Sequence, residues 1–212
     1  MMRRRTRSDQ WIYQFDRALR TLLPPTARME LPIPVPPNDE TLTTFEAHHV
    51  AGMMRVTHSG EVCLQGLYQG QRLFSQRPEV SAEMDQSAAN DLIHLARCGE
   101  RLRQLDSHTS LLAPCFYLAS LSVGATTGGV SERLGLGVLA ASEAQAAKQL
   151  DEQQTRLPAS DHTSKTLLRQ MGIDKRHHAQ LALEAGGLRL PAPVQWAMRG
   201  VFKAVSKTTY HV

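Results

Sequence analysis

Residues 131–155 read SERLGLGVLAASEAQAAKQLDEQQT, a stretch that predicts a helix with one acidic residue on its apolar face. That residue is Glu143, and every side chain three, four or seven positions away from it is apolar. These neighbours are Leu136, Leu139, Ala140, Ala146, Ala147 and Leu150. Because a charged carboxylate without a partner is costly to bury, we expect Glu143 to meet a cation or to take up a proton.

The predicted helix over residues 79–105 carries a polar pair on a similar face. Asp91 and His94 lie three positions apart, so both side chains point the same way and can reach one metal ion. At the same spacings around Asp91 lie the apolar residues Met84, Ala88, Leu95 and Cys98. Taken alone, His94 would more often be a packed core histidine than a ligand.

Two further predicted helices each aim one polar side chain at an apolar interior. The helix over residues 41–76 places Glu61 among Met54, Leu64 and Tyr68. The helix over residues 160–184 places His178 among Leu168, Met171, Leu181 and Ala185. We interpret Tyr68 and Met171 as core residues rather than as cofactor contacts.

Four helices that direct carboxylates and histidines at one interior indicate a ferritin-like helical bundle, in which such side chains hold two metal ions. Oxygen and imidazole ligands without thiolates favour iron or manganese over zinc. Each position also has a plainer explanation, since a lone helical glutamate is usually solvated. Four such positions on four helices make that explanation the weaker one.

The whole chain supports an all-α fold of one main domain. It has 212 residues, of which 42% are hydrophobic and 21% charged, an ordinary balance for a globular protein. Six of its eleven prolines lie between residues 24 and 37, where they exclude a helix. We therefore expect an N-terminal helix (9–23) and a Pro-rich linker in residues 1–40, and the bundle in residues 41–212. The remaining predicted helices span 112–129, 131–155 and 192–209.

The charge favours contact with an anionic surface, either phospholipid or nucleic acid, although solvated tails explain the basic ends of the chain equally well. The formal net charge is +4, with basic residues gathered at both ends of the chain. The predicted last helix, 192–209, is amphipathic. Its apolar residues are Val194, Trp196, Ala197, Val201, Phe202 and Val205, and its basic ones are Arg199, Lys203 and Lys207. Such helices lie in the interface of anionic membranes, although packing on the bundle explains the pattern equally well.

Two other features bear on the compartment and on the membrane. Residues 109–131 contain no charged residue, but glycines, a proline and hydroxyl side chains favour a buried or interfacial helix over a membrane span. The three cysteines match no zinc or redox motif and indicate reduced thiols. No signal peptide is expected, because no apolar stretch follows the N-terminal arginines.

Three segments resemble the demethoxyubiquinone hydroxylases. They are AGMMRVTHSGEVCLQGLYQGQ (51–71), TSLLAP (109–114) and LPAP (190–193), and the resemblance covers roughly residues 45–212. It implies hydroxylation of a polyprenyl methoxy-benzoquinol ring with O2 in ubiquinone biosynthesis, at a site of two iron ions. The implied metal ligands are Glu61, Asp91, His94, Glu143, position 175 and His178.

The sequence departs from the family pattern at two of these ligand positions and at one further position, on the helix of Glu143. The family has glutamate where this chain has Asp91 and Lys175, and histidine where it has Gln149. A lysine ammonium cannot ligate a cation and repels one. We expect Asp174 to substitute if the helix rotates slightly, with Lys175 turned towards solvent.

The resemblance also implies a location and partners. The protein would sit peripherally on the cytoplasmic face of a bacterial cell membrane, or on the mitochondrial inner membrane in a eukaryote. Its partners would be the benzoquinol, O2, an anionic membrane surface and other ubiquinone-synthesis proteins, with no nucleic acid. Two alternatives stay open: a bundle that binds quinone or lipid without turnover because of Lys175, and a ferritin-like protein that oxidises iron.

Overall fold

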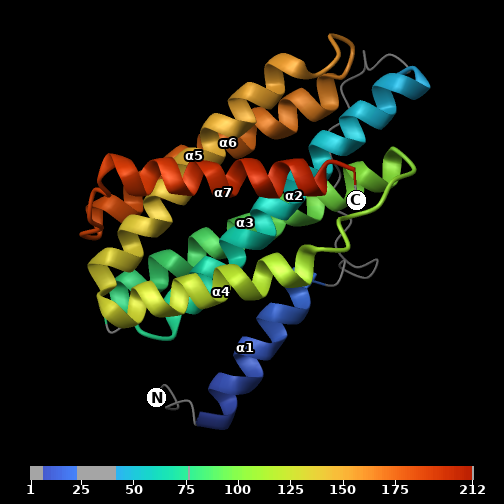
Figure 1. Ribbon diagram of the computed structural model, residues 1–212. Coiled ribbons are helices and arrows are strands. Elements are labelled where there is room, and N and C mark those ends of the chain that lie inside the picture. The colour runs from blue at the N-terminus through green and yellow to red at the C-terminus, as the bar shows by residue number, and fades with distance from the viewer. Residues whose placement is uncertain (1–6, 23–41, 76, 212) are drawn as a thin grey trace.

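The computed structural model describes residues 7–22, 42–75 and 77–211, which form seven helices and no strand (Figure 1). The helices are α1 (Arg7–Leu22), α2 (Thr44–Arg72), α3 (Pro78–Gln104), α4 (Ala113–Val130), α5 (Glu132–Arg156), α6 (His162–Glu184) and α7 (Ala192–Thr209). The all-α, ferritin-like fold predicted from the sequence is confirmed. The predicted Pro-rich linker and the boundary near residue 40 lie outside the described residues, so the division into 1–40 and 41–212 stays a prediction.

Helices α2, α3, α5 and α6 enclose the interior of the bundle. Helix α2 packs on α3 and α5, and α6 packs on α5 and α3. Two apolar clusters fill this interior, one around Met54, Leu102 and Leu168 and the other around Leu64 and Leu139. Along α2, α3 and α6, buried polar residues lie between these two clusters, and in α5 Glu143 lies among residues of the second cluster. The bundle therefore carries one buried polar layer between two apolar ones.

Local sequence signals fix where several helices begin. Helix α2 starts with a capping box, in which the Thr43 side chain accepts from the Glu46 amide and the Glu46 carboxylate accepts from the Thr43 amide. Asp161 caps α6 by accepting from the amide of Ser164 at 2.9 Å. A proline stands in the first turn of α3, α4 and α7, where its missing N–H is not needed.

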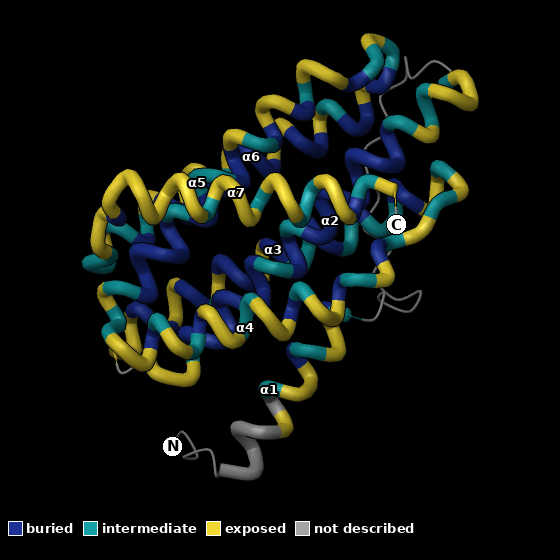
Figure 2. Tube along the Cα trace, viewed as in Figure 1, coloured by how far each residue is buried: buried dark blue, intermediate teal, exposed yellow. Residues whose placement is uncertain are grey.

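Helix α4 lies along the outside of the bundle and packs closely on α2. Gly66 of α2 has no room for a side chain, because a Cβ there would lie 2.6 Å from the carbonyl oxygen of Tyr117. The opposite face of α4 is exposed and uncharged, and it includes Leu118, Val123 and Val130 (Figure 2). Among the described residues, no helix is long and apolar enough to cross a membrane.

Helix α7 also runs along the outside of the bundle (Figure 1). Met198 and Phe202 pack against the apolar core, while Trp196 and Val201 are 66% and 63% exposed. The residue after the helix, Tyr210, anchors this end of the chain. Its ring covers Gly52, and its hydroxyl lies 2.5 Å from Nδ1 of His49. Helix α7 is thus held on the bundle and still presents an apolar surface.

Candidate metal centre

The polar layer contains all six positions predicted as metal ligands. Glu61 comes from α2, Asp91 and His94 from α3, Glu143 from α5, and Lys175 and His178 from α6. Each of these residues is at most 3% exposed. The inward orientation predicted for Glu61, Asp91, His94, Glu143 and His178 agrees with the structure.

Lys175 lies at the middle of this layer, and its side chain is completely buried. Its Nζ donates a hydrogen bond of 2.8 Å to Oε2 of Glu61 and forms an ion pair of 2.7 Å with Oδ1 of Asp91. A third carboxylate oxygen, Oε2 of Glu143, lies 3.4 Å from the same nitrogen. The expected turn of Lys175 towards solvent is not what the structure shows, because three carboxylates hold the ammonium inside.

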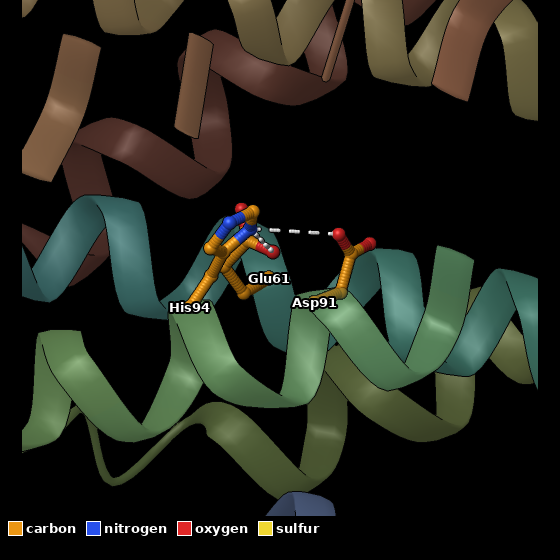
Figure 3. A group of neighbouring side chains, drawn as sticks. All are labelled: Glu61, Asp91 and His94. Carbon is orange, nitrogen blue, oxygen red and sulfur yellow. Dashed lines mark ion pairs between the residues drawn. The ribbon is translucent and has the colours of Figure 1, made fainter. Parts of the chain in front are cut away.

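The acidic and histidine side chains form two groups that share Asp91 and that could each hold a metal ion. In the first, Nδ1 of His94 lies 3.6 Å from Oδ1 of Asp91 and 4.0 Å from Oε2 of Glu61 (Figure 3). In the second, Nδ1 of His178 lies 3.4 Å from Oδ1 of Asp91 and 3.8 Å from Oε1 of Glu143. Both histidines present Nδ1 to the carboxylates.

Asp174 lies at the rim of the layer rather than inside it. Its Oδ2 is 3.0 Å from Nε2 of His94, and its Oδ1 accepts a hydrogen bond of 3.1 Å from the Gln170 amide. Its side chain remains 28% exposed. Asp174 contacts Nε2 of His94, the ring nitrogen that faces away from Glu61 and Asp91, and so orients the ring, as carboxylates often do for metal-binding histidines. It does not lie among the ligand atoms of the centre.

Tyr68 has a contact that was not predicted from the sequence. The Tyr68 hydroxyl donates a hydrogen bond of 2.7 Å to Oε1 of Glu143, so Tyr68 contacts the centre as well as the core. The residues three and four positions from Tyr68 could not reveal this hydrogen bond, because only the fold brings α2 beside α5. Gln149 lines a groove between α2, α5 and α7. Met171 is a core residue, as expected.

Burial and close charges oppose each other throughout the centre. Burial raises the pKa of Glu61 to about 7, against the lowering effect of Lys175. Burial alone would lower the pKa of His178, but the carboxylates of Asp91 and Glu143 outweigh it and raise that pKa to about 9. The same competition raises the pKa of Lys175 above its ordinary value, so its amine stays charged.

Several inward-facing atoms of the layer have no hydrogen-bond partner. They are Oδ2 of Asp91, Oε2 of Glu143, and Nδ1 of both His94 and His178. Buried polar atoms are seldom left in this state, and a bound cation accounts for carboxylate oxygens and histidine nitrogens together. The donor set of two glutamates, one aspartate and two histidines therefore fits a divalent metal such as iron.

Carboxylate-rich metal proteins combine a ferritin-like bundle with a buried layer of carboxylates and histidines. The fold and the polar layer place this chain in that class. The profile of the COQ7 family, described as ubiquinone biosynthesis protein COQ7, matches residues 48–211. The chain belongs to this family, and the resemblance found in the motifs is confirmed.

Curated relatives agree with this assignment. A protein of Pseudomonas fluorescens (strain SBW25) is 46% identical over 205 residues, which is 96% of this chain and 95% of the relative. A protein of Azotobacter vinelandii is 47% identical over 206 residues, which is 97% of this chain and 96% of the relative. Both are named 3-demethoxyubiquinol 3-hydroxylase.

Proposed function

We propose that this chain is a 3-demethoxyubiquinol 3-hydroxylase, which adds one oxygen atom from O2 to the ring of a polyprenyl benzoquinol. The observation that carries the proposal is the buried layer of Glu61, Asp91, Glu143, His94 and His178. In this layer Oδ2 of Asp91, Oε2 of Glu143 and Nδ1 of both histidines lack a hydrogen-bond partner. This layer occurs in a chain that matches relatives of that name over nearly its full length. Oxygen transfer from O2 needs a redox metal or an organic cofactor, and the donor set suits iron.

Iron, when bound, supplies the redox chemistry with O2. The resemblance predicts two iron ions per chain, with Glu61, Asp91, His94, Glu143 and His178 as ligands and Lys175 at the sixth position. The protein contributes placement and exclusion of water. Tyr68 fixes one oxygen of Glu143, and the two apolar clusters on either side of the layer keep bulk solvent away.

The surface around α7 supports binding of an isoprenoid tail. A cavity of about 270 Å³ lies between α5, α6 and α7. Its apolar lining includes Ala140, Ala144, Leu183, Leu190 and Met198. A hydrocarbon tail gains free energy in such a groove because it leaves water. The exposed Trp196 and Val201 of α7 would lie close to the lipid from which the tail comes.

The same surface supports peripheral attachment to a membrane. Arg199, Lys203 and Lys207 are exposed on the helix that carries Trp196, which is the combination that binds anionic interfaces. The exposed, uncharged face of α4 adds a second apolar surface. We propose the cytoplasmic face of a bacterial membrane, or the mitochondrial inner membrane in a eukaryote, with further ubiquinone-synthesis proteins as partners.

The hydroxylase is tested by turnover with isotopic oxygen. Iron-loaded protein would be given a reductant, 3-demethoxyubiquinol and 18O2, and the lipid product analysed by mass spectrometry. We expect a product that gains a single labelled oxygen atom. Glu143→Gln should abolish it, while the matched variant Glu152→Gln, on the exposed face of the same helix, should retain it. An unlabelled ring in every sample would reject the proposal.

A second function is favoured by one observation, the buried ammonium of Lys175 among the carboxylates. If this charge leaves no metal at the centre, the bundle would bind quinone or lipid without turnover. The same samples distinguish the two functions. Saturable quinone binding by a protein that contains no iron and forms no product would support the binding bundle.

A further inference from the structure

Lys175 occupies the space that a metal ion would need between Glu61 and Asp91. A carboxylate oxygen binds a first-row divalent metal such as zinc at about 2.0–2.2 Å. Nζ of Lys175 lies only 2.8 Å from Oε2 of Glu61 and 2.7 Å from Oδ1 of Asp91. An ion held by both oxygens would lie directly against the ammonium, with two like charges in contact. The ion and the ammonium therefore compete for one place.

The group formed by Asp91, Glu143 and His178 has room for a metal ion. Oδ2 of Asp91, Oε2 of Glu143 and Nδ1 of His178 have no hydrogen-bond partner. These three residues form a group whose ligand atoms all lie within 4.8 Å of one another. Lys175 contacts this group through Asp91, whose Oδ1 lies 2.7 Å from Nζ, but Oδ2 of Asp91 has no partner and Oε2 of Glu143 is 3.4 Å from the ammonium. Three atoms from three helices thus lack a hydrogen-bond partner and lie close enough to bind one ion.

We propose that this centre holds a single divalent metal ion, bound by Asp91, Glu143 and His178, and that the ammonium of Lys175 takes the place of a second ion. The proposal concerns the same centre as the proposed hydroxylase. It is tested by counting metal ions, so its failure can be told apart from a failure of the hydroxylase.

The charges of the layer agree with one ion rather than two. Glu61, Asp91 and Glu143 bring three negative charges, and Lys175 brings one positive charge. The remaining two negative charges are neutralised by one divalent cation. Two such cations would leave a net charge of +2 inside a layer that is at most 3% exposed, which is strongly unfavourable.

Asp174 does not change this balance in favour of a second ion. Counted as a fourth carboxylate, it would still leave a charge of +1 beside two divalent ions and Lys175. Its oxygens are also engaged at the rim, by His94 on one side and Gln170 on the other. Asp174 therefore stabilises the orientation of His94 and does not provide the missing ligand.

The test is a titration of tag-free, metal-stripped full-length protein with Mn²⁺, followed by calorimetry and electron paramagnetic resonance. The wild-type chain should bind one Mn²⁺ and give the hyperfine pattern of an isolated ion. Lys175→Glu should bind two and give the spectrum of a coupled pair. Glu143→Gln should lose the ion, while the matched surface variant Glu152→Gln should keep it.

Every outcome of this titration bears on the proposal. Two ions in the wild-type chain would show that Lys175 leaves the centre, and none would show that its charge excludes metals altogether. One ion in a folded Lys175→Glu variant would show that the ammonium is not what excludes the second. If Lys175→Glu does not fold, Lys175→Met removes the charge at similar length and should also take up more Mn²⁺ than the wild type. No gain in that variant would overturn the proposal.

Discussion

Replacing Lys175 by methionine should strongly destabilise the metal-free protein. Methionine keeps most of the apolar stem and removes the ammonium that lies 2.8 Å from Glu61 and 2.7 Å from Asp91. Removing one partner of a buried ion pair costs about 3–5 kcal/mol, because the remaining charge stays buried without compensation. Since Lys175 lies near three buried carboxylates, we expect a loss in this range for Lys175→Met at pH 7.

The pH and metal dependence of this loss distinguish it from a packing defect. Lys175 lowers the pKa of Glu61, so without it Glu61 keeps its proton to higher pH and the penalty shrinks as pH falls. Added Mn²⁺ should offset the penalty by binding the carboxylates. Urea unfolding in EDTA, with and without Mn²⁺, measures both effects, and Lys148→Met on the exposed face of α5 is the control. If Lys175→Met in EDTA were as stable as that control, our account of the layer would be wrong.

Three further predictions concern other parts of the molecule. Burial lowers the pKa of His58 from 6.5 to about 4, so the unfolded state binds a proton more readily than the folded state. The free energy of unfolding of the wild type should therefore fall by about 3 kcal/mol as pH drops from 6.5 to about 4. Urea unfolding of His58→Gln should show that much less acid sensitivity, and parallel pH curves would contradict it. Gly124→Ala places a Cβ against the backbone of Leu67 and should lower the free energy of unfolding by about 1–3 kcal/mol. Gly99→Ala has open space around it and should be neutral or stabilising, and thermal unfolding measures both variants. Trp196→Glu should weaken flotation with anionic liposomes, and unchanged flotation would remove α7 from the membrane surface.

The helices and the inward positions were predictable because both depend on local signals. Apolar periodicity placed Glu143 inside α5, and the positions of the prolines placed the start of α2 and α3 within three residues. Asp91 and His94 share a face simply because they are three residues apart. These features need no knowledge of which helices become neighbours.

The orientation of Lys175 was not predictable, because it depends on three helices that the sequence does not place relative to one another. Taken alone, a lysine beside a metal site is expected to extend towards water on its flexible stem. Here Glu61 from α2, Asp91 from α3 and Glu143 from α5 all meet its ammonium. The hydrogen bond from Tyr68 to Glu143 was missed for the same reason.

The place of residues 109–131 was only partly predictable. Their lack of charge indicated a buried or interfacial helix, and the membrane span was rightly disfavoured. The close packing of α4 on α2 depends on Gly66 and Gly124 facing each other's helix, a pairing that appears only in three dimensions. This packing buries one narrow face of α4 and leaves Leu118 and Val123 exposed.

The most direct test of the central claim is a crystal structure of Mn²⁺-soaked protein with anomalous diffraction data at the manganese edge. We predict one anomalous peak in the polar layer, coordinated by Asp91, Glu143 and His178, with the Lys175 ammonium still between Glu61 and Asp91. Two peaks in the layer, with Lys175 displaced towards solvent, would contradict this account.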